Sequence, residues 1–333
     1  MDPHRPMPEP EDGWRPGALI EMLRRRAGLL SQIRDFFHQR EVMEVETPVC
    51  SRCATTDPAI ESLQTTFTGP QAAAGLPLYL HTSPEFAMKR LLAAGSGPIY
   101  QICKVFRDGE AGARHNPEFT LLEWYRPGFD HHRLMDEVEA LLLHLVPEST
   151  PARRLSYQAL FQQYLDIDPH RATPEELRHC AEGQGLADAG RLQLETRDAW
   201  LDLLLSHYIE PRLGDGACFV YDYPASQAAL ARIRPGSPSL AERFELYLDG
   251  VELANGFHEL TDAAQQRARF EQECEVRKQS GLPAVPMDHR LLQALEQGLP
   301  SSAGVALGID RLLMQLSGAS HIGEVLAFSL DRA

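Results

Sequence analysis

The stretch that most constrains the fold is residues 106–125, FRDGEAGARHNPEFTLLEWY. It joins an apolar run at 99–106 to a second apolar run at 119–125, and this pattern predicts an antiparallel hairpin with a long polar tip. The tip carries Arg107 and His115 among acidic residues. A guanidinium at the mouth of a hairpin suits a phosphate ligand, although these residues alone are also compatible with a solvated loop of mixed charge.

A second hairpin is predicted at 243–257, where apolar and charged residues alternate on either side of an Asp-Gly turn. Pairing across this turn sets residue 247 opposite residue 252 and Glu245 opposite residue 254. Glu245 and Glu252 then lie on one face as diagonal neighbours. Two carboxylates in this arrangement repel each other unless a cation lies between them. The pattern therefore favours Mg²⁺ held by carboxylates and a nucleotide phosphate, with a plain surface pair as the alternative.

In the same hairpin, the spacing of Glu252 and Glu259 determines whether their side chains share a face of the sheet. Glu259 lies seven residues beyond Glu252, so a regular strand would place the two carboxylates on opposite faces. If both serve one site, a bulge near Gly256 must restore the parity.

A third informative segment, GVALGIDRLLMQL at 304–316, predicts a strand that joins directly to a helix beginning near Asp310. Gly304 and Gly308 would allow a ligand to approach the backbone. Arg311 falls in the first helical turn, where the helix dipole opposes a cation, so an anionic ligand would explain its position. The glycine spacing matches neither a P-loop nor a dinucleotide-binding fingerprint.

The remaining elements follow from periodicity. Helices are predicted over 18–40, 85–94, 131–146, 156–165, 174–184, 197–209, 261–279 and 288–297, and strands over 41–49 and 76–81. The helix at 85–94 follows Thr82-Ser83-Pro84-Glu85, with a hydroxyl at the cap and proline at the first helical position. Glu85 complements the helix dipole or faces a bound amine, and the sequence leaves both interpretations open.

Composition narrows the class of protein. The net charge of −15 disfavours a broad grip on nucleic acid. No apolar run is long enough for a membrane span, and the N-terminus has no secretory h-region, so we expect a cytoplasmic protein whose Pro-rich residues 1–17 form a disordered arm. The six cysteines are scattered, and the Cys50-Ser-Arg-Cys53 spacing has no second pair to complete a zinc site.

Taken in order, these segments resemble the catalytic domain of a class II aminoacyl-tRNA synthetase of the lysyl type, over about residues 19–333. The helix and strand that end at Pro48 resemble motif 1, the dimer element. The segments 106–119 and 304–313 resemble motifs 2 and 3. The strings typical of the lysyl type are TSPE at 82–85, HNPEF at 115–119, EWY at 123–125 and ELANGFHEL at 252–260.

This resemblance implies an α+β fold with a mostly antiparallel β-sheet flanked by helices. Residues 18–333 would form one catalytic domain without the anticodon-binding OB domain, because motif 1 begins within some forty residues of Met1. With no tRNA-binding module expected, the likeness is greatest to the truncated lysyl-synthetase paralogues that ligate (R)-β-lysine to elongation factor P. The resemblance further implies a homodimer with no stable tRNA binding and no membrane association.

The implied chemistry is an AMP-forming ligation. ATP, Mg²⁺ and (R)-β-lysine or lysine form an aminoacyl adenylate, which a lysine ε-amine of elongation factor P then attacks. The implied catalytic residues are Arg107, holding the α-phosphate, and Arg311, holding the γ-phosphate. Further contacts to ATP would come from His115, Asn116, Phe119 (stacking on adenine), Glu252, Leu253 and Gly308. Substrate would be bound by Ser83, Glu85, Tyr125, Asn255, Glu259 and Ala306, and magnesium by Glu245 and Glu252.

Two positions depart from the family pattern. Gly109 stands where motif 2 usually has glutamate, so either Glu110 substitutes through a loop shift or the adenine contact is lost. Ala306 stands where lysyl synthetases typically have glycine, and its methyl group would reshape the amino-acid site in a way that suits a displaced amino group.

Two other functions stay open at this stage. One is a minimal synthetase that charges tRNA or another small acceptor. The other is an inactive regulatory paralogue, which retention of Arg107, Arg311 and the predicted acidic residues disfavours because buried unpaired charges are costly.

Overall fold

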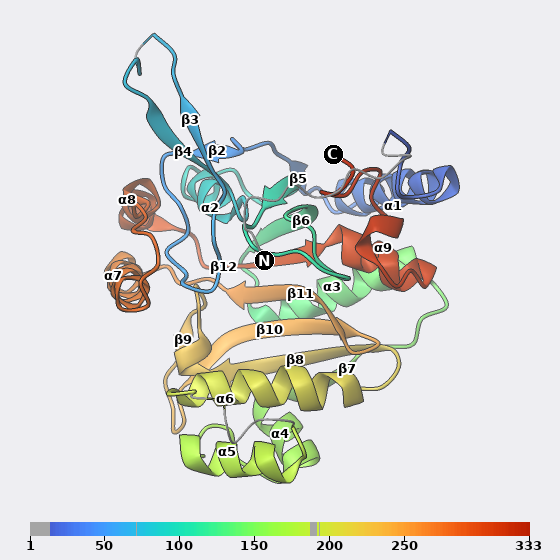
Figure 1. Ribbon diagram of the computed structural model, residues 1–333, viewed down its shortest axis with the longest axis vertical. Coiled ribbons are helices and arrows are strands. Elements are labelled where there is room, and N and C mark those ends of the chain that lie inside the picture. The colour runs from blue at the N-terminus through green and yellow to red at the C-terminus, as the bar shows by residue number, and fades with distance from the viewer. Residues whose placement is uncertain (1–13, 71, 187–191, 193) are drawn as a thin grey trace. The chain divides into compact units, whose positions relative to one another are not determined.

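The computed structural model describes residues 14–70, 72–186, 192 and 194–333 (Figure 1). Most of the predicted N-terminal arm, residues 1–13, lies outside the described residues. The chain divides into two compact units. The first comprises Met1–Trp124, Asp262–Pro300 and Leu307–Ala333, and the second comprises Tyr125–Thr261 and Ser301–Ala306.

The first unit combines helices with short strands. Its helices are α1 (Ile20–His38), α2 (Glu85–Ala93), α7 (Ala263–Gln279), α8 (His289–Gly298) and α9 (Ile309–Ser317), followed by a 3₁₀ turn at Ile322–Glu324. A small antiparallel sheet has the order β2 (Cys50–Ser51), β4 (Leu76–Leu80), β3 (Gln64–Phe67). In the main sheet, β1 (Met43–Glu44) pairs in parallel with β5 (Ile99–Phe106), which neighbours β6 (Glu118–Pro127).

The second unit is built on the antiparallel strands β8 (Ala217–Pro224), β10 (Leu240–Leu248) and β11 (Val251–His258). The strand order is β12 (Ser302–Gly308), β11, β10, β8, β7 (Arg153–Ser156), and β9 (Ile233–Arg234) also pairs with β10. The helices are α3 (His131–Leu145), α4 (Tyr157–Leu165), α5 (Pro174–Gly183) and α6 (Arg197–Leu204). A π-helical turn at Leu205–Ile209 and 3₁₀ turns at Glu210–Arg212 and Ala225–Gln227 complete it.

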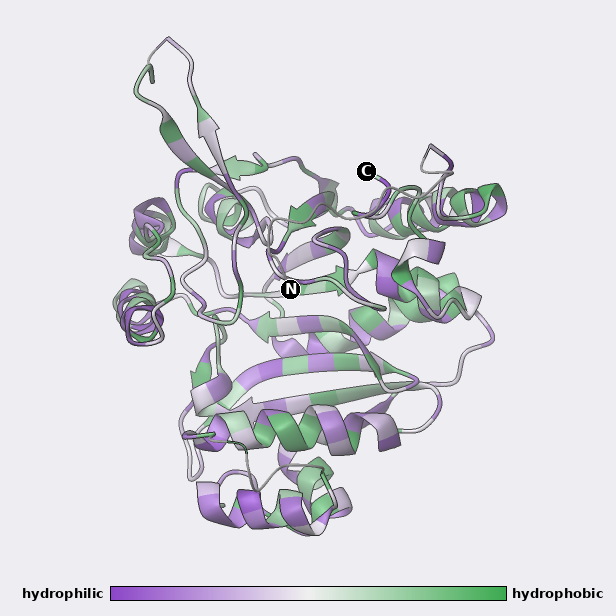
Figure 2. Cartoon of the chain, in the orientation of Figure 1, coloured by the Kyte–Doolittle hydropathy of each residue, from purple (hydrophilic) through white to green (hydrophobic). Residues whose placement is uncertain are grey.

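Hydrophobic and hydrophilic residues alternate along β10 and β11 (Figure 2). Different elements pack against the two faces of this part of the sheet. Val220 and Tyr247 belong to a buried core with α4, α5 and α6. Phe219 and Phe244, which alternate with them, pack edge to face with ring centroids 5.7 Å apart. Helix α3 contacts β10 and β11 on this second face.

The predicted α+β class is confirmed, because most strand pairs are antiparallel and helices pack beside them. The predicted helices are present, with small shifts at their ends. Of the predicted strand over 41–49, only Met43–Glu44 forms a strand, and the next strand is Cys50–Ser51. Pro48, which has no N–H to donate, lies in the gap between the two. The capping residue of α7 is Asp262 and not Thr261. Sequence reasoning missed β3, β7, β8 and β9.

The predicted hairpin is present, with its bulge in a different place. Asp249 and Gly250 both adopt positive φ, 51° and 73°, as the two-residue turn requires. Residue 247 pairs with Glu252 as predicted, but Glu245 pairs with Asn255 and not with residue 254. The register shift therefore leaves Leu253 as the extra residue, so the predicted bulge near Gly256 is wrong in position.

The shift at Leu253 nevertheless has the predicted consequence. Glu252 faces the same side as residue 247, and the bulge then brings Asn255, two residues after it, to that side as well. Glu259 follows Asn255 at an even spacing, so Glu252 and Glu259 share one face. Gly256 has another reason for being glycine. A methyl group there would lie 2.4 Å from Cζ of Phe244 and 3.0 Å from Cβ of Val305.

This crowding predicts that Gly256→Ala destabilises the protein by about 1–3 kcal/mol, because Phe244 is fully buried and cannot yield without repacking. Gly28→Ala is the matched control. Gly28 lies inside α1, nothing approaches its added methyl group within 4 Å, and alanine should stabilise the helix by about 0.8–1.0 kcal/mol. Urea unfolding measures both effects. Equal midpoints for Gly256→Ala and wild type would contradict the packing argument.

Candidate active site

The sequence-predicted site residues fall into two groups, one in each unit. The first unit holds Ser83, Glu85, Arg107, His115, Asn116, Phe119, Gly308 and Arg311. The second unit holds Tyr125, Glu245, Glu252, Leu253, Asn255, Glu259 and Ala306.

Arg107 lies at the base of the predicted hairpin tip, directly after β5. Its backbone N–H donates to the carbonyl oxygen of Pro117 (2.9 Å), which closes the base of the tip. Its guanidinium carbon lies 5.1 Å from the centroid of the Phe119 ring, and its Nη1 lies 3.6 Å from Oε1 of Glu110. The buried Nε has no hydrogen-bond partner among the described residues. Nε of Arg107 is therefore available to donate a hydrogen bond to an anionic ligand.

Gly109 adopts a φ of +77°, and this conformation explains the departure from the motif. A glutamate at this position would be strained, because side chains rarely adopt left-handed φ values. The neighbouring Glu110 pairs with Arg107, so its carboxylate is directed to the base of the tip.

His115 and Arg311 come together from segments far apart in the sequence. Nη2 of Arg311 donates to Nε2 of His115 at 2.6 Å. Burial, together with the charge of Arg311, lowers the pKa of His115 below its ordinary value. The lowered pKa favours the neutral imidazole, whose Nε2 can accept the hydrogen bond from Arg311.

A buried ion pair that no local sequence pattern predicts holds the start of α9. Asp310 is 2% exposed, and its carboxylate accepts from Nη1 of Arg26 (2.5 Å) and from the backbone N–H of Thr120 (2.7 Å). Arg26 also donates to the hydroxyl of Thr120 (2.7 Å). This network joins α1, β6 and α9, and so fixes the helical turn that carries Arg311. Gly308 is the N-cap residue of that helix.

Three other predicted residues of the first unit already have partners within the chain. Asn116 is buried, accepts from the N–H of Leu330 (3.0 Å) and donates to the carbonyl of Glu118 (2.7 Å). Ser83 donates to Glu123 (2.7 Å). Glu85 accepts from the buried ammonium of Lys89 (2.6 Å). Glu85 therefore has a protein cation beside it, an interaction that neither sequence interpretation anticipated.

In the second unit, Tyr125 and Glu259 converge on Gly304. A methyl group at Gly304 would lie 2.3 Å from Cε1 of Tyr125 and 2.6 Å from Oε1 of Glu259. Residue 304 is therefore glycine because a larger side chain would collide with Tyr125 and Glu259. The sequence had instead suggested that the glycine allows a ligand to approach the backbone. Ala306, half-buried and two residues further along β12, faces the same side. Glu259 is 1% exposed, so its carboxylate suits a cationic group that is desolvated with it.

Glu245 is the centre of a buried polar cluster on β8 and β10. One carboxylate oxygen accepts from the hydroxyls of Tyr223 and Tyr247, each at 2.6 Å, and the other pairs with Arg243. Burial, and then the charge of Glu245, raise the pKa values of both tyrosines well above the ordinary value. Arg243 also donates to Asn255 (3.2 Å).

Arg243 is the functional candidate that sequence reasoning missed. Burial opposes its charged form, but the neighbouring carboxylate of Glu245 raises its pKa above the ordinary value. The sequence did contain a signal for this pair. Arg243 lies two residues before Glu245 in a strand with alternating residues, and this spacing places the two side chains on one face.

The donor set partly fits the predicted magnesium ion. Glu245 and Glu252 supply hard oxygen ligands on one face, as Mg²⁺ requires. Arg243 pairs with Glu245, and the charge of Glu252 also acts on Arg243, so both carboxylates already lie near a protein cation. Leu253 is 3% exposed at the bulge, so its side chain belongs to the core and only its backbone could contact a nucleotide.

Comparison with known proteins identifies the class. The family model described as "tRNA synthetases class II (D, K and N)" matches residues 14–332, so the chain belongs to this family. The predicted class II fold is thereby confirmed, and membership implies use of ATP. In the part of the chain that the structure describes, every helix is too short or too polar to cross a bilayer.

Within this family, the chain is similar over nearly its full length to curated ligases that share one name. The chain is 54% identical over 321 residues to the elongation factor P–(R)-beta-lysine ligase of Pseudoalteromonas translucida, covering 96% of this chain and 98% of the relative. It is 52% identical to the ligase of the same name from Erwinia tasmaniensis and 53% identical to that from Vibrio cholerae, each covering 96% of this chain and 98% of the relative. The resemblance inferred from the sequence is confirmed.

The cluster around Glu245 predicts strong energetic coupling. Glu245→Gln or Arg243→Met alone should cost about 3–5 kcal/mol of unfolding free energy, because each leaves its partner as a buried, uncompensated charge. The double variant should cost clearly less than the sum of the two. Chemical unfolding of the four proteins gives the coupling energy. The exposed Arg24–Glu21 pair is the control and should couple by less than about 1 kcal/mol. Additive effects at Glu245 and Arg243 would refute the coupling.

Proposed function

We propose that this chain activates (R)-β-lysine with ATP and ligates it to the ε-amino group of a lysine of elongation factor P. The near full-length identity of 52–54% to ligases of that name supports this proposal. The observation that carries it within the chain is the buried carboxylate of Glu259 against Tyr125 and Gly304, with Ala306 on the same face. The ammonium groups of β-lysine are suitable ligands for a carboxylate on this face.

The first step joins the amino-acid carboxylate to the α-phosphorus of ATP and releases pyrophosphate. Arg107 is assigned to the α-phosphate and Arg311 to the γ-phosphate, where each offsets the charge that develops during the displacement. His115 keeps Arg311 oriented by accepting its hydrogen bond. Phe119 is assigned to adenine, and His115, Asn116, Glu252, Leu253 and Gly308 to the remaining contacts with ATP. This chemistry relies on positioning and charge, so it needs no protein nucleophile.

Binding of the amino acid is assigned to Ser83, Glu85, Tyr125, Asn255, Glu259 and Ala306. In this proposal Glu259 partners an ammonium group, and Glu85 is shared between Lys89 and the substrate. Magnesium is assigned to Glu245 and Glu252, which lie on one face of the sheet. The ion would supply charge neutralisation at the phosphates.

In the second step, the neutral ε-amine of the acceptor lysine attacks the acyl carbon of the adenylate. The new bond is an amide, AMP leaves with the electrons of the cleaved acyl–phosphate bond, and the amine loses a proton. We propose that the active form is a homodimer, on the resemblance of the α1 region to motif 1. The acceptor is a translation factor, and we therefore propose that the reaction takes place in the cytoplasm.

The proposal predicts the acceptor. Purified protein with ATP, Mg²⁺ and radiolabelled (R)-β-lysine should label one band, at the size of elongation factor P, in an RNase-treated lysate of its host lacking this protein. Denaturing electrophoresis reads out the product, which should be sensitive to protease. Label that appears only without RNase would instead identify a synthetase for tRNA, and no label in either case would favour a regulatory paralogue.

Two variants make the labelling experiment specific. Arg107→Ala should lower the labelling rate by at least about 100-fold, the usual cost of removing a group that stabilises transition-state charge. Arg171→Ala is the matched control, because its side chain is 76% exposed outside α1 and the assigned site, and it should label at the wild-type rate.

The position of Ala306 predicts a specificity effect. Ala306→Gly should raise the use of α-lysine relative to (R)-β-lysine by at least about ten-fold, as expected when one methyl group is removed from a substrate site. The ratio of kcat/KM values for the two isomers, from amino-acid-dependent pyrophosphate exchange, measures the effect. Ala303→Gly is the control, because Ala303 is buried on the other face of β12 and should leave the ratio unchanged. An unchanged ratio in Ala306→Gly would remove this residue from the specificity site.

A further inference from the structure

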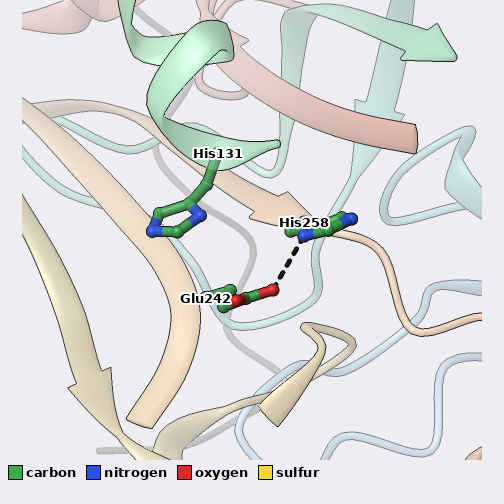
Figure 3. A group of neighbouring side chains, drawn as sticks. All are labelled: His131, Glu242 and His258. Carbon is green, nitrogen blue, oxygen red and sulfur yellow. Dashed lines mark hydrogen bonds and ion pairs between the residues drawn. The ribbon is translucent and has the colours of Figure 1, made fainter. Parts of the chain in front are cut away.

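Three buried side chains that the proposed reaction does not use meet in the second unit. His131 begins α3, Glu242 belongs to β10, and His258 ends β11 (Figure 3). Their exposed fractions are 2%, 8% and 8%. One nitrogen of each imidazole and one carboxylate oxygen lie within 4.8 Å of one another. Two imidazoles and a carboxylate are a ligand set typical of zinc.

This cluster lies on the opposite face of the sheet from Glu245 and Glu259. Glu242 directly precedes Arg243, whose side chain pairs with Glu245, and His258 directly precedes Glu259. Adjacent residues of a regular strand point to opposite faces, which separates His258 from Glu259. The β8–β10 pairing shifts register between Ala241 and Phe244, so Glu242 is placed by its 2.7 Å hydrogen bond to His258, away from the candidate active site. Helix α3 contacts β10 and β11 here and supplies the third side chain.

His131 is the observation that points to a ligand. Neither of its buried ring nitrogens has a hydrogen-bond partner among the described residues, which is unfavourable for a buried polar group. Nε2 lies 3.5 Å from Oδ1 of Asp222, beyond a good hydrogen bond. Figure 3 shows the other ring nitrogen on the side facing His258. A carboxylate behind an imidazole is the usual arrangement for a metal-binding histidine, because it sets which nitrogen is free to coordinate.

His258 has a matching arrangement. Nε2 is hydrogen-bonded to the hydroxyl oxygen of Ser301 (3.1 Å), and Nδ1 is hydrogen-bonded to Oε2 of Glu242 (2.7 Å), the contact that a bound ion would replace. When Nε2 donates its proton to Ser301, the Nδ1 lone pair is directed toward the cluster. Each histidine thus has a polar group behind it and one nitrogen facing Glu242.

We propose that His131, Glu242 and His258 bind a divalent transition metal ion of the Zn²⁺ class, with Asp222 and Ser301 orienting the two imidazoles. Zinc bonds of about 2.1 Å place tetrahedral ligand atoms about 3.4 Å apart. A bound ion would therefore replace the Glu242–His258 hydrogen bond and draw together ligand atoms that now lie within 4.8 Å of one another. Three protein ligands leave a fourth position to water. The ion would tie the first residue of α3 to both strands that carry the candidate active-site residues on their other face, and so acts as a positioning element.

The surrounding arginines set a competing arrangement. Nε of Arg232 lies 3.7 Å from Oε2 of Glu242, and Arg234 lies 3.8 Å from Glu242 and 2.7 Å from Asp222. These cations offset the two carboxylates in part, whereas they leave both nitrogens of His131 without a donor or acceptor. A network held by the arginines alone would bind no metal. The experiment must therefore distinguish this network from a metal site.

The test uses the full chain, treated with chelator, dialysed and titrated with Co²⁺. We expect tetrahedral Co²⁺ absorption that saturates at one equivalent, disappears on adding Zn²⁺, and accompanies a rise in melting temperature. His131→Gln should abolish the absorption. Asp222→Asn, which neutralises the carboxylate behind His131 and weakens its pairing with Arg234, should weaken binding by about 10- to 100-fold. His179→Gln is the matched control, since His179 is exposed on α5 of the same unit, and it should bind as wild type does.

Two results would overturn the site. One is wild-type protein that shows neither the Co²⁺ absorption nor a melting shift. The other is absorption that persists in His131→Gln, which would place the ion elsewhere. Glu242→Gln provides a second test if His131→Gln does not fold, and retention of full affinity in that variant also contradicts the proposal. These readouts do not depend on ligase activity.

Discussion

The arrangement of the second unit depends on the register of two strands. Between Leu246 and residue 247 the pairing of β10 with β11 shifts by one residue, so that Leu253 is left unpaired. Without this bulge, Glu252 would face away from Glu259. With it, both carboxylates lie on one face, while His258 faces the other side. The extra residue Leu253 thus determines which polar side chains of β11 face the proposed active site and which face the proposed metal site.

A second constraint is the pairing of buried charges. Glu245 lies against Arg243, Asp310 against Arg26, and Glu85 against Lys89. Leaving any of these charges alone in the interior would be costly, so each partner also fixes the position of a neighbouring functional group. Asp310 sets the start of α9 and therefore the place of Arg311. Arg243 restrains Glu245 and Asn255 together.

These two constraints suit a ligase that works by positioning. Formation and use of an adenylate require phosphate, carboxylate and amine to be held in line, and rigid side chains lower the cost of that alignment. Strands β10 and β11 present candidate substrate groups on one face and are anchored to α3 on the other. A metal ion at His131 would strengthen the anchored side without touching the reacting atoms, which is why its test is independent of activity.

Local sequence patterns were sufficient to predict most helices, the main hairpins and the family. The hairpin around 106–125, the Asp-Gly turn, the strand–helix junction at 304–316 and the order of the motifs were all readable, because turn chemistry and periodicity are local properties. The sequence alone could not determine which distant residues meet. The Arg311–His115 contact, the partners of Glu245, the convergence on Gly304 and the cluster at His131 each join segments far apart in the chain. Only tertiary packing decided them, since the position of one bulge and the partner of one buried charge depend on neighbours that local patterns do not encode.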